Sequence, residues 1–297
     1  MRFKIDEEFL VRADLSGRER MKSHLLSKHE KITETTIARS ILSRPIEGYF
    51  IGNGKQLVTV LAAHHALESI TTNFAFLLCD ILLSKSTLGE SNNVDCKLLL
   101  SKCCFLIVPC VNPDGVELRM HGAYDSPLKE RQLRISGGDF SLWQANARGV
   151  DLNHNYDYGF LEYKQIEAEQ GIVPGATLYS GEYPESEPET RGVANLIRTL
   201  MPSLVISLHT QGEEIYCQPK DRKMARRAER LALLTGYTAK EASGTAAYGG
   251  LCDYTGSLGI PSFTLELGRG VNPLPECDIP EIFLRAGEAI AILPTLL

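Results

Sequence analysis

The sequence of 297 residues lacks any apolar run long enough to span a membrane, and it contains no internal repeat or low-complexity segment. Its first residues are polar and acidic, without the apolar stretch that a signal peptide requires. The eight cysteines include no Cys-x-x-Cys pair, and in a chain of this length they do not indicate a disulfide framework. We therefore expect a protein of the reducing cytoplasm that keeps most of its cysteines as buried thiols.

The sequence also lacks an excess of basic residues. Its formal net charge is −6, which argues against nucleic acid or an anionic membrane as a partner. Hydrophobic residues make up 43% of the chain and charged residues 23%, and these proportions exclude global disorder and allow one large core. We expect one α/β body, since folds of this class often reach this length as a single domain.

Short apolar runs alternate with helical patterns along the chain. Strands are expected at residues 48–52, 56–61, 105–109 and 204–208 and before Glu266, and helices at 66–85, 186–200, 221–236 and 280–296. This alternation predicts a single-domain, three-layer α/β/α fold with a mixed, mostly parallel sheet flanked by helices.

Four segments carry more local expectations. Residues 1–40 are charged and are expected to form a helical extension packed on the body. Residues 48–52 and 56–61 are expected to form a hairpin around the turn Gly52-Asn53-Gly54. The segment Asn112-Pro113-Asp114-Gly115 is typical of a turn, and residues 115–185 of a mostly irregular stretch of the kind that is usually functional. The capping box Ser186-Glu187-Pro188-Glu189 is expected to start the helix that follows.

Polar side chains at predicted strand ends define a candidate site. Those that fall at or just beyond such ends are His65, Asn112, His209 and Glu266, and open α/β sheets bind ligands at this edge. The spacing His65-x-x-Glu68 at the start of a helix can place both side chains on one face. Together with His209 they would make a two-histidine, one-carboxylate zinc site with its fourth position open. Two alternatives are that Glu68 only caps the helix and that His64 is the ligand.

Six motifs follow one another along the chain. They are His65-x-x-Glu68, Pro109-x-x-Asn112-Pro113-Asp114-Gly115, Gly149-Val150-Asp151-Leu152-Asn153, Leu208-His209, Tyr248 and Thr264-Leu265-Glu266-Leu267-Gly268. In this order they resemble the zinc carboxypeptidase family, over about residues 40 to 297. The resemblance implies a zinc carboxypeptidase-like fold in which residues 41–297 are the catalytic domain. Residues 143–153, 186–190 and 209–213 are most similar to the bacterial branch that cleaves peptidoglycan stem peptides between γ-D-glutamate and a diamino acid.

The resemblance implies a metal site and two catalytic residues. One zinc ion per chain would be bound by His65, Glu68 and His209. Glu266 would accept the proton of a zinc-bound water and pass it to the leaving amine, and Tyr248 would close over the substrate as a hydrogen-bond donor. Asp151 would orient one of the zinc histidines. The alternatives are a buried Glu266 paired with Arg269 and a Tyr248 that is an ordinary loop residue.

The resemblance also implies the substrate-binding residues Asn153, His154, Arg148 and Gln144. Two of them depart from the family pattern. His154 stands where the family usually has the arginine that binds a terminal carboxylate, and Gln144 where it has an arginine that stabilises the oxyanion. Histidine and glutamine lack the permanent charge and the bidentate geometry of arginine. Either Arg148 or another basic residue takes over this role, or the preferred substrate differs.

The leading hypothesis is a zinc metallopeptidase that hydrolyses the γ-D-glutamyl–diaminopimelate bond of stem peptides during muropeptide turnover or recycling. One alternative is a general metallocarboxypeptidase or zinc deacylase, and another is a non-catalytic protein that binds stem peptides. The expected partner is a peptide or muropeptide substrate. The sequence leaves open the oligomeric state, the metal bound in the cell and the role of residues 1–40.

Overall fold

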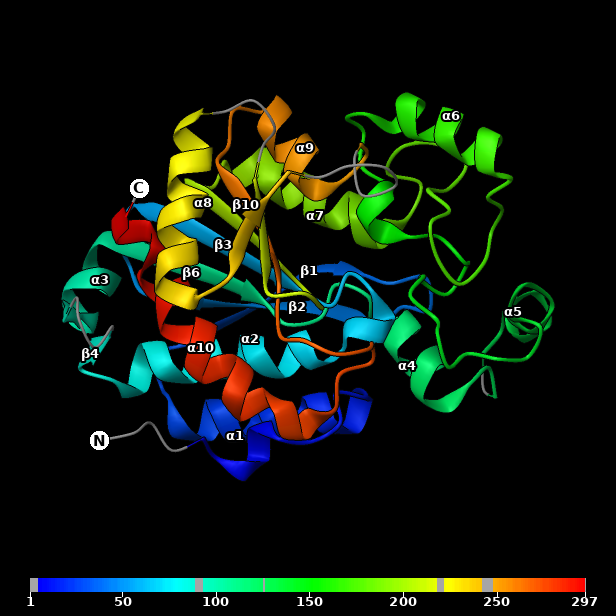
Figure 1. The fold of residues 1–297 in the computed structure, drawn as a ribbon. Coiled ribbons are helices and arrows are strands. Elements are labelled where there is room, and N and C mark those ends of the chain that lie inside the picture. The colour runs from blue at the N-terminus through cyan, green and yellow to red at the C-terminus, as the bar shows by residue number, and fades with distance from the viewer. Residues whose placement is uncertain (1–4, 89–92, 125, 218–221, 242–247, 297) are drawn as a thin grey trace.

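The computed structural model describes residues 5–88, 93–124, 126–217, 222–241 and 248–296. Figure 1 shows a central sheet with helices on both faces, and α1, α2 and α10 lie on the side opposite to α7 and α9. The predicted three-layer fold is confirmed. Among the described residues, no helix is both long and apolar enough to cross a membrane.

The main sheet has eight strands in the order β1-β2-β6-β3-β7-β10-β8-β9. Their bounds are β1 Thr33–Arg39, β2 Pro45–Ile51, β3 Gln56–Ala62, β6 Cys103–Val108, β7 Leu204–His209, β8 Glu214–Cys217, β9 Thr238–Lys240 and β10 Ser262–Glu266. The four central strands β6, β3, β7 and β10 are parallel, whereas β1, β2 and β8 introduce antiparallel pairs. A separate two-stranded sheet joins β4 Thr87–Leu88 to β5 Val94–Asp95.

The central strands form unbroken apolar runs because both of their faces are buried. In β3, Val58 and Val60 face the first core, which α1, α2, α8 and α10 cover. Leu61 faces the second core, which α7 and α9 cover. Since successive side chains of a strand point to opposite faces, burial of both faces removes the polar alternation of a half-exposed strand.

Most helices lie between strands along the chain, whereas α1 precedes β1 and α10 follows β10. Their bounds are α1 Leu15–Lys28, α2 Ile70–Ser84, α3 Cys96–Lys102, α4 Pro113–His121, α5 Lys129–Ser136, α6 Phe160–Gln170, α7 Pro188–Leu200, α8 Arg222–Thr235, α9 Leu251–Ser257 and α10 Ile279–Ile292, with single 3-10 turns η1 Glu7–Phe9, η2 Ala66–Glu68, η3 Leu152–His154, η5 Glu276–Asp278 and η6 Leu293–Leu296. The predicted helices at 66–85, 186–200 and 280–296 are thus confirmed to within a few residues, as is the described part of the helix at 221–236.

The predicted hairpin of residues 48–52 and 56–61 is wrong. Strand β6 lies between β2 and β3, and β2 pairs in antiparallel fashion with β1 instead. Gly52 and Gly54, which suggested a hairpin turn, instead allow this segment to lie in close contact with the backbone that leads into β6. A Cβ atom at Gly54 would lie only 1.8 Å from the carbonyl carbon of Lys102, and Gly52 has φ +91°.

The N-terminal segment is helical only in part. Helix α1 ends at Lys28, and β1 then adds an edge strand to the sheet, in keeping with the β-branched residues of Thr33–Arg39. The amide of Asn73 on α2 donates to the carbonyl oxygens of Phe9 (2.8 Å) and Val11 (2.7 Å), so the segment before α1 is bound to the body. The division of the chain into two units at residue 40 stays a prediction.

Two further local predictions differ from the structure. Asn112 does not form an isolated turn, because its side-chain oxygen accepts a hydrogen bond from the backbone N–H of Gly115 (3.0 Å) and caps α4, with Pro113 in the first turn. The described part of residues 115–185 is mostly irregular, as expected, although helices α4, α5 and α6 interrupt it. Helix α7 begins at Pro188 without a side-chain cap, and the hydroxyl of Ser186 donates to Glu187 (2.9 Å) instead.

Candidate active site

Three side chains meet at the carboxyl ends of two neighbouring strands. His65 and Glu68 follow β3, His209 is the last residue of β7, and these two strands are parallel. His65 Nδ1 lies 2.9 Å from one oxygen of Glu68, and His209 Nδ1 lies 3.0 Å from the other. The two Nδ1 atoms are 3.3 Å apart. Three such donors within 4.8 Å of one another form a candidate metal site.

The chemistry of these donors fits a zinc ion. Burial would raise the pKa of Glu68, but the charges of His65 and His209 outweigh burial and lower it to about 2. The carboxylate is therefore ionised in a buried place, where a bound cation would compensate its charge. Two imidazole nitrogens and a carboxylate are the ligand set of catalytic zinc sites that keep one position open.

The outer nitrogen of each histidine has a partner of its own. His65 Nε2 donates to Asp151 (3.0 Å), and the Nε2 of His209 lies 3.0 Å from the hydroxyl of Ser207. Asp151 is held in place by the backbone N–H groups of Leu178 and Asn153, both at 3.1 Å. These contacts of the two Nε2 atoms leave both Nδ1 atoms directed towards Glu68. Metal-binding histidines are commonly oriented in this way, by a hydrogen bond at the ring nitrogen that does not bind the metal.

His64 takes no part in this cluster. Its Nε2 lies 3.0 Å from the hydroxyl of Tyr156, and its ring stacks on that of His209 with centroids 5.7 Å apart. The alternative in which His64 replaces His65 as the ligand therefore has no support among the described residues.

Glu266 ends β10, the strand beside β7. It stands in register with His209 on one side and with Glu214 of β8 on the other. Burial raises the pKa of Glu266 to about 7, the charge of His209 opposes this shift, and Glu68 adds to it. Arg269, the alternative partner of Glu266, forms its ion pair with Glu213, with Nε 2.7 Å from Oε2.

Tyr248 lies just before α9, with 48% of its surface exposed and φ +67°. Its carbonyl oxygen accepts a hydrogen bond from Nδ1 of His154 (3.2 Å). The side-chain oxygen of Asn153 likewise accepts from the backbone N–H of Leu251 (3.3 Å). Asn153 and His154, both in the turn η3, thus connect that turn to the start of α9, and the ring of Tyr248 remains open to solvent.

His154 is buried and does not offer a charge to a substrate. Its ring stacks on Tyr163 at a centroid distance of 4.0 Å and an angle of 8°, and only 6% of its surface is exposed. Burial lowers the pKa of His154, although Asp151 opposes the shift, so the ring is neutral near pH 7. In this structure His154 cannot replace the carboxylate-binding arginine of the family by charge.

Gln144 lies beside the segment that carries two of the metal ligands, since its carbonyl oxygen accepts from the N–H of Ala66 (2.9 Å). The side-chain oxygen of Gln144 accepts from the hydroxyl of Thr177 (2.5 Å), which leaves its amide hydrogens for another acceptor. The amide of Asn112 joins the same two segments, donating to the carbonyl oxygens of His64 (3.0 Å) and Gln144 (3.2 Å).

Arg148 is bound to the buried start of α7. Its Nε donates to Glu187 (3.0 Å), and its Nη2 donates to the carbonyl oxygen of Ser186 (3.4 Å). Its side chain nevertheless remains 38% exposed. Sequence reasoning did not identify Thr177 or Glu187 as partners of candidate site residues, because long-range folding alone brings them to Gln144 and Arg148.

Glu189, in the first turn of α7, leads to a prediction about stability. Burial raises its pKa to about 8, and the nearby Asp114 and Glu187 add to the shift, although its carboxylate accepts from the N–H of Ile41 (3.1 Å). The folded state therefore holds a proton that the unfolded chain loses above about pH 4.3, so this group's contribution to stability falls as pH rises towards 8.

We expect Glu189→Gln to remove this loss of stability with rising pH. The free energy of unfolding of the variant, relative to wild type, should be higher at pH 8 than at pH 5 by a few kcal/mol in order of magnitude. Urea unfolding of both proteins at pH 5, 6.5 and 8 measures it. Glu182→Gln on the exposed surface is the control. Parallel pH profiles for wild type and Glu189→Gln would contradict the prediction.

Comparisons with known proteins agree with this geometry. The profile of the zinc carboxypeptidase family matches residues 19–285. The chain is 32% identical to γ-D-glutamyl-L-diamino acid endopeptidase 1 of Lysinibacillus sphaericus over 263 residues, which are 85% of this chain and 64% of that protein. The chain therefore spans less than two thirds of that relative's length.

Two solved structures show the same fold. Thrombin-activatable fibrinolysis inhibitor superimposes with a TM-score of 0.77 at 20% identity, covering 98% of this chain and 76% of that one. Murein-tripeptide amidase MpaA of Escherichia coli O157 superimposes with a TM-score of 0.57 at 20% identity, covering 87% and 91%. The family match covers most of the sequence and includes the residues of the metal cluster, and the chain belongs to the zinc carboxypeptidase family.

Proposed function

We propose that this protein is a zinc-dependent peptidase that hydrolyses the bond between γ-D-glutamate and a diamino acid such as diaminopimelate in peptidoglycan stem peptides. The observation that carries the proposal is the cluster of His65, Glu68 and His209 beside Glu266 at adjacent strand ends. The name of the Lysinibacillus sphaericus relative, which describes cleavage at a γ-D-glutamyl-diamino acid bond, supports the substrate.

The positions of the chain's own residues support a role for each of them in this proposal. His65, Glu68 and His209 would hold zinc, which when bound lowers the pKa of a water ligand and polarises the scissile carbonyl. Glu266 accepts the proton of the attacking water at its carboxylate and then donates it to the leaving amine. Burial raises the pKa of Glu266 above its usual value, which favours a group that both accepts and releases a proton near neutral pH.

Gln144 and Arg148 would contribute to substrate binding. The free amide hydrogens of Gln144 can donate to the carbonyl oxygen that becomes negative during attack, with Thr177 fixing the orientation of the amide. Arg148 is the candidate for pairing with a carboxylate of the substrate, since its guanidinium is partly exposed while Glu187 holds it in place.

The buried, neutral His154 favours this substrate over an ordinary C-terminal peptide. A carboxypeptidase binds the terminal carboxylate of its substrate with a charged partner, and the position next to Asn153 supplies none here. A stem peptide offers other polar groups, among them the α-carboxylate of the γ-linked glutamate.

A mass-spectrometric digest tests the proposal. L-Ala-γ-D-Glu-meso-diaminopimelate is incubated with zinc-loaded protein, beside an α-linked L-Ala-L-Glu-L-Lys peptide and an N-acetyl amino acid of the same concentration. Release of diaminopimelate from the γ-linked peptide alone supports the proposed substrate. Release of the C-terminal residue from the α-linked peptide at an equal rate would favour a general carboxypeptidase, and hydrolysis of the N-acetyl amino acid a deacylase.

A further inference from the structure

The ring of His154 donates to the backbone of Tyr248. Its Nδ1 lies 3.2 Å from the carbonyl oxygen of Tyr248. A carbonyl oxygen can only accept, so Nδ1 carries the one N–H of the neutral ring. The ring stacks on Tyr163 of α6 with centroids 4.0 Å apart, and the hydroxyl of Tyr163 donates in turn to the carbonyl oxygen of Leu178 (2.9 Å). Packing on α6 therefore fixes the direction in which His154 donates.

Further contacts join the turn η3 to the segment before α9. The side-chain oxygen of Asn153 accepts from the N–H of Leu251 (3.3 Å), and the carbonyl oxygen of Gly249 accepts from the N–H of Tyr156 (3.4 Å). A Cβ atom at Gly249 would lie only 3.0 Å from the carbonyl oxygen of His154, so the two backbones are in close contact. The backbone that follows Tyr248 is thus bound to η3 and its flanking residues.

The turn η3 is also connected to the metal cluster. Asp151, which caps η3, accepts from the N–H of Asn153 (3.1 Å) and from Nε2 of His65 (3.0 Å). One short segment therefore holds both the carboxylate that orients a metal ligand and the histidine that binds Tyr248. Through residues 151–154, the backbone of Tyr248 is linked to the metal site.

The conformation of Tyr248 depends on such contacts. Its φ of +67° lies in the left-handed region, which a residue with a Cβ atom rarely adopts unless its surroundings stabilise it. Its ring is 48% exposed, so packing of the ring contributes little to holding it in place. The place of the phenol hydroxyl is therefore set mainly by the backbone, to which His154 donates its hydrogen bond.

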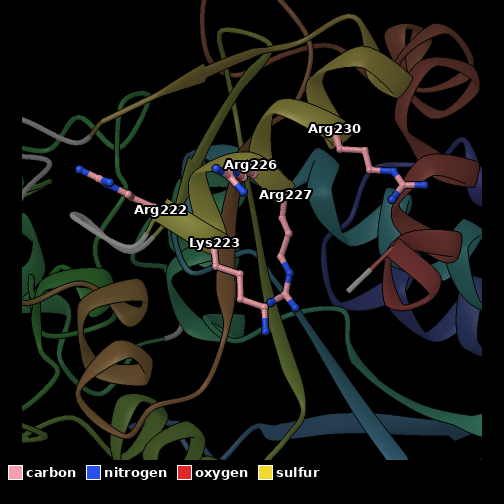
Figure 2. Close-up of a pocket in the computed structure, with 5 residues that line it drawn as sticks. All are labelled: Arg222, Lys223, Arg226, Arg227 and Arg230. Atoms are coloured by element: carbon pink, nitrogen blue, oxygen red, sulfur yellow. The ribbon is translucent and has the colours of Figure 1, made fainter.

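The cationic side chains of α8 lack an enclosed environment of this kind. Five of them line a surface hollow of about 450 Å³, and Figure 2 shows that they all extend from this one helix: Arg222, Lys223, Arg226, Arg227 and Arg230. A hollow whose described lining comes from a single exposed helix leaves long side chains much of their rotational freedom. His154, in contrast, lies between α6, η3 and the segment before α9, and its donor is preorganised.

We propose that His154 is a positioning residue for Tyr248 and holds its phenol where the hydroxyl can donate to the substrate. The inference rests on the proposed function and on the donor role that the family pattern implies for Tyr248. His154 acts only through Tyr248, because its ring is buried, with 6% of the residue exposed, and its N–H is already used. The position where the family usually has a carboxylate-binding arginine thus contributes orientation instead of charge.

Steady-state kinetics of the zinc-loaded protein with the γ-linked tripeptide test the proposal. His154→Phe keeps an aromatic ring against Tyr163 but loses the N–H, and we expect kcat to fall by about 10–10²-fold while KM changes by less than about threefold. His154→Asn, whose amide can place an N–H close to the position of Nδ1, should recover most of kcat. In a Tyr248→Phe background, His154→Phe should lower kcat by less than about twofold, because no phenol hydroxyl remains to be positioned.

His24→Phe is the matched control. His24 of α1 also combines a polar contact, with Asp6 (3.0 Å), and an aromatic contact, with Phe9, and its replacement should leave kcat within about twofold. Equal kcat of His154→Phe and wild type would overturn the proposal. So would an equal loss from His154→Phe with and without the Tyr248 hydroxyl, since His154 would then act on the fold in general.

Hydrogen–deuterium exchange without substrate tests the contact separately from the reaction. His154→Phe should speed the exchange of the amides of residues 248–254 by about fivefold or more and leave α1 unchanged, and His154→Asn should restore the protection. Unchanged exchange in His154→Phe would overturn the inference whatever the substrate. If wild type left the tripeptide intact, the proposed function would fail, and the exchange result would still decide whether His154 holds Tyr248.

Discussion

Replacement of Glu266 by glutamine is expected to lower kcat for the γ-linked tripeptide by about 10²–10⁴-fold, the usual contribution of a general acid–base group. Glutamine has the size and shape of glutamate but cannot accept the water proton. Because Glu266 is not among the three clustered donors, the variant should bind as much zinc as wild type. Steady-state kinetics and zinc analysis of the same preparation measure the two effects.

Glu214→Gln provides the control for this experiment. Glu214 stands opposite Glu266 on β8, at the same edge of the sheet, and its carboxylate pairs with Lys240. Its replacement changes the local charge as Glu266→Gln does, without removing the proposed base, and should leave kcat within about twofold. If Glu266→Gln kept a tenth or more of wild-type activity, a group other than Glu266 would have to accept the proton of the attacking water.

Replacement of His209 by alanine is expected to abolish stoichiometric zinc binding. Only His65 and Glu68 would remain, and the loss of one ligand of a zinc site corresponds to about 10²–10³-fold in affinity. The carboxylate of Glu68 would also lose one of the two partners that hold it, since His209 Nδ1 lies 3.0 Å from its oxygen.

Thermal unfolding with and without zinc measures the consequence. Zinc at 100 times its Kd stabilises wild type by about 2.7 kcal/mol through binding to the folded state, and it should add almost nothing to His209→Ala. His121→Ala, at an exposed histidine of α4, should keep the full zinc effect. Full stabilisation of His209→Ala by zinc would mean that the metal binds at a different place.

Local patterns in the sequence predict much of the fold and of the candidate site. Helical patterns located α2 and α10, the segment Ser186-Glu187-Pro188-Glu189 located the start of α7, and the unbroken apolar runs located β6 and β7. Open α/β sheets bind their ligands beyond the carboxyl ends of parallel strands. From residue order alone, this rule predicted that His65, His209 and Glu266 lie together. These inferences succeeded because each depends on the residues of one element and on the direction in which its strand runs.

Strand pairing could not be predicted in the same way. The turn signal at Gly52-Asn53-Gly54 predicted a hairpin, yet β6 pairs between β2 and β3. A glycine favours both a tight turn and a close passage of two backbones, and only the chain packed against it decides between them. The same limit applies to β1, whose β-branched residues lie within a charged segment that was expected to be helical.

The sequence by itself determined the metal-binding residue types, their order and the strand ends on which they lie. The tertiary structure alone decided the environment of these side chains, burying His154 against Tyr163 and holding Arg148 on Glu187. The physical reason is that residue type and spacing act within one element. Burial, pKa and partner choice depend on groups that folding brings from distant parts of the chain.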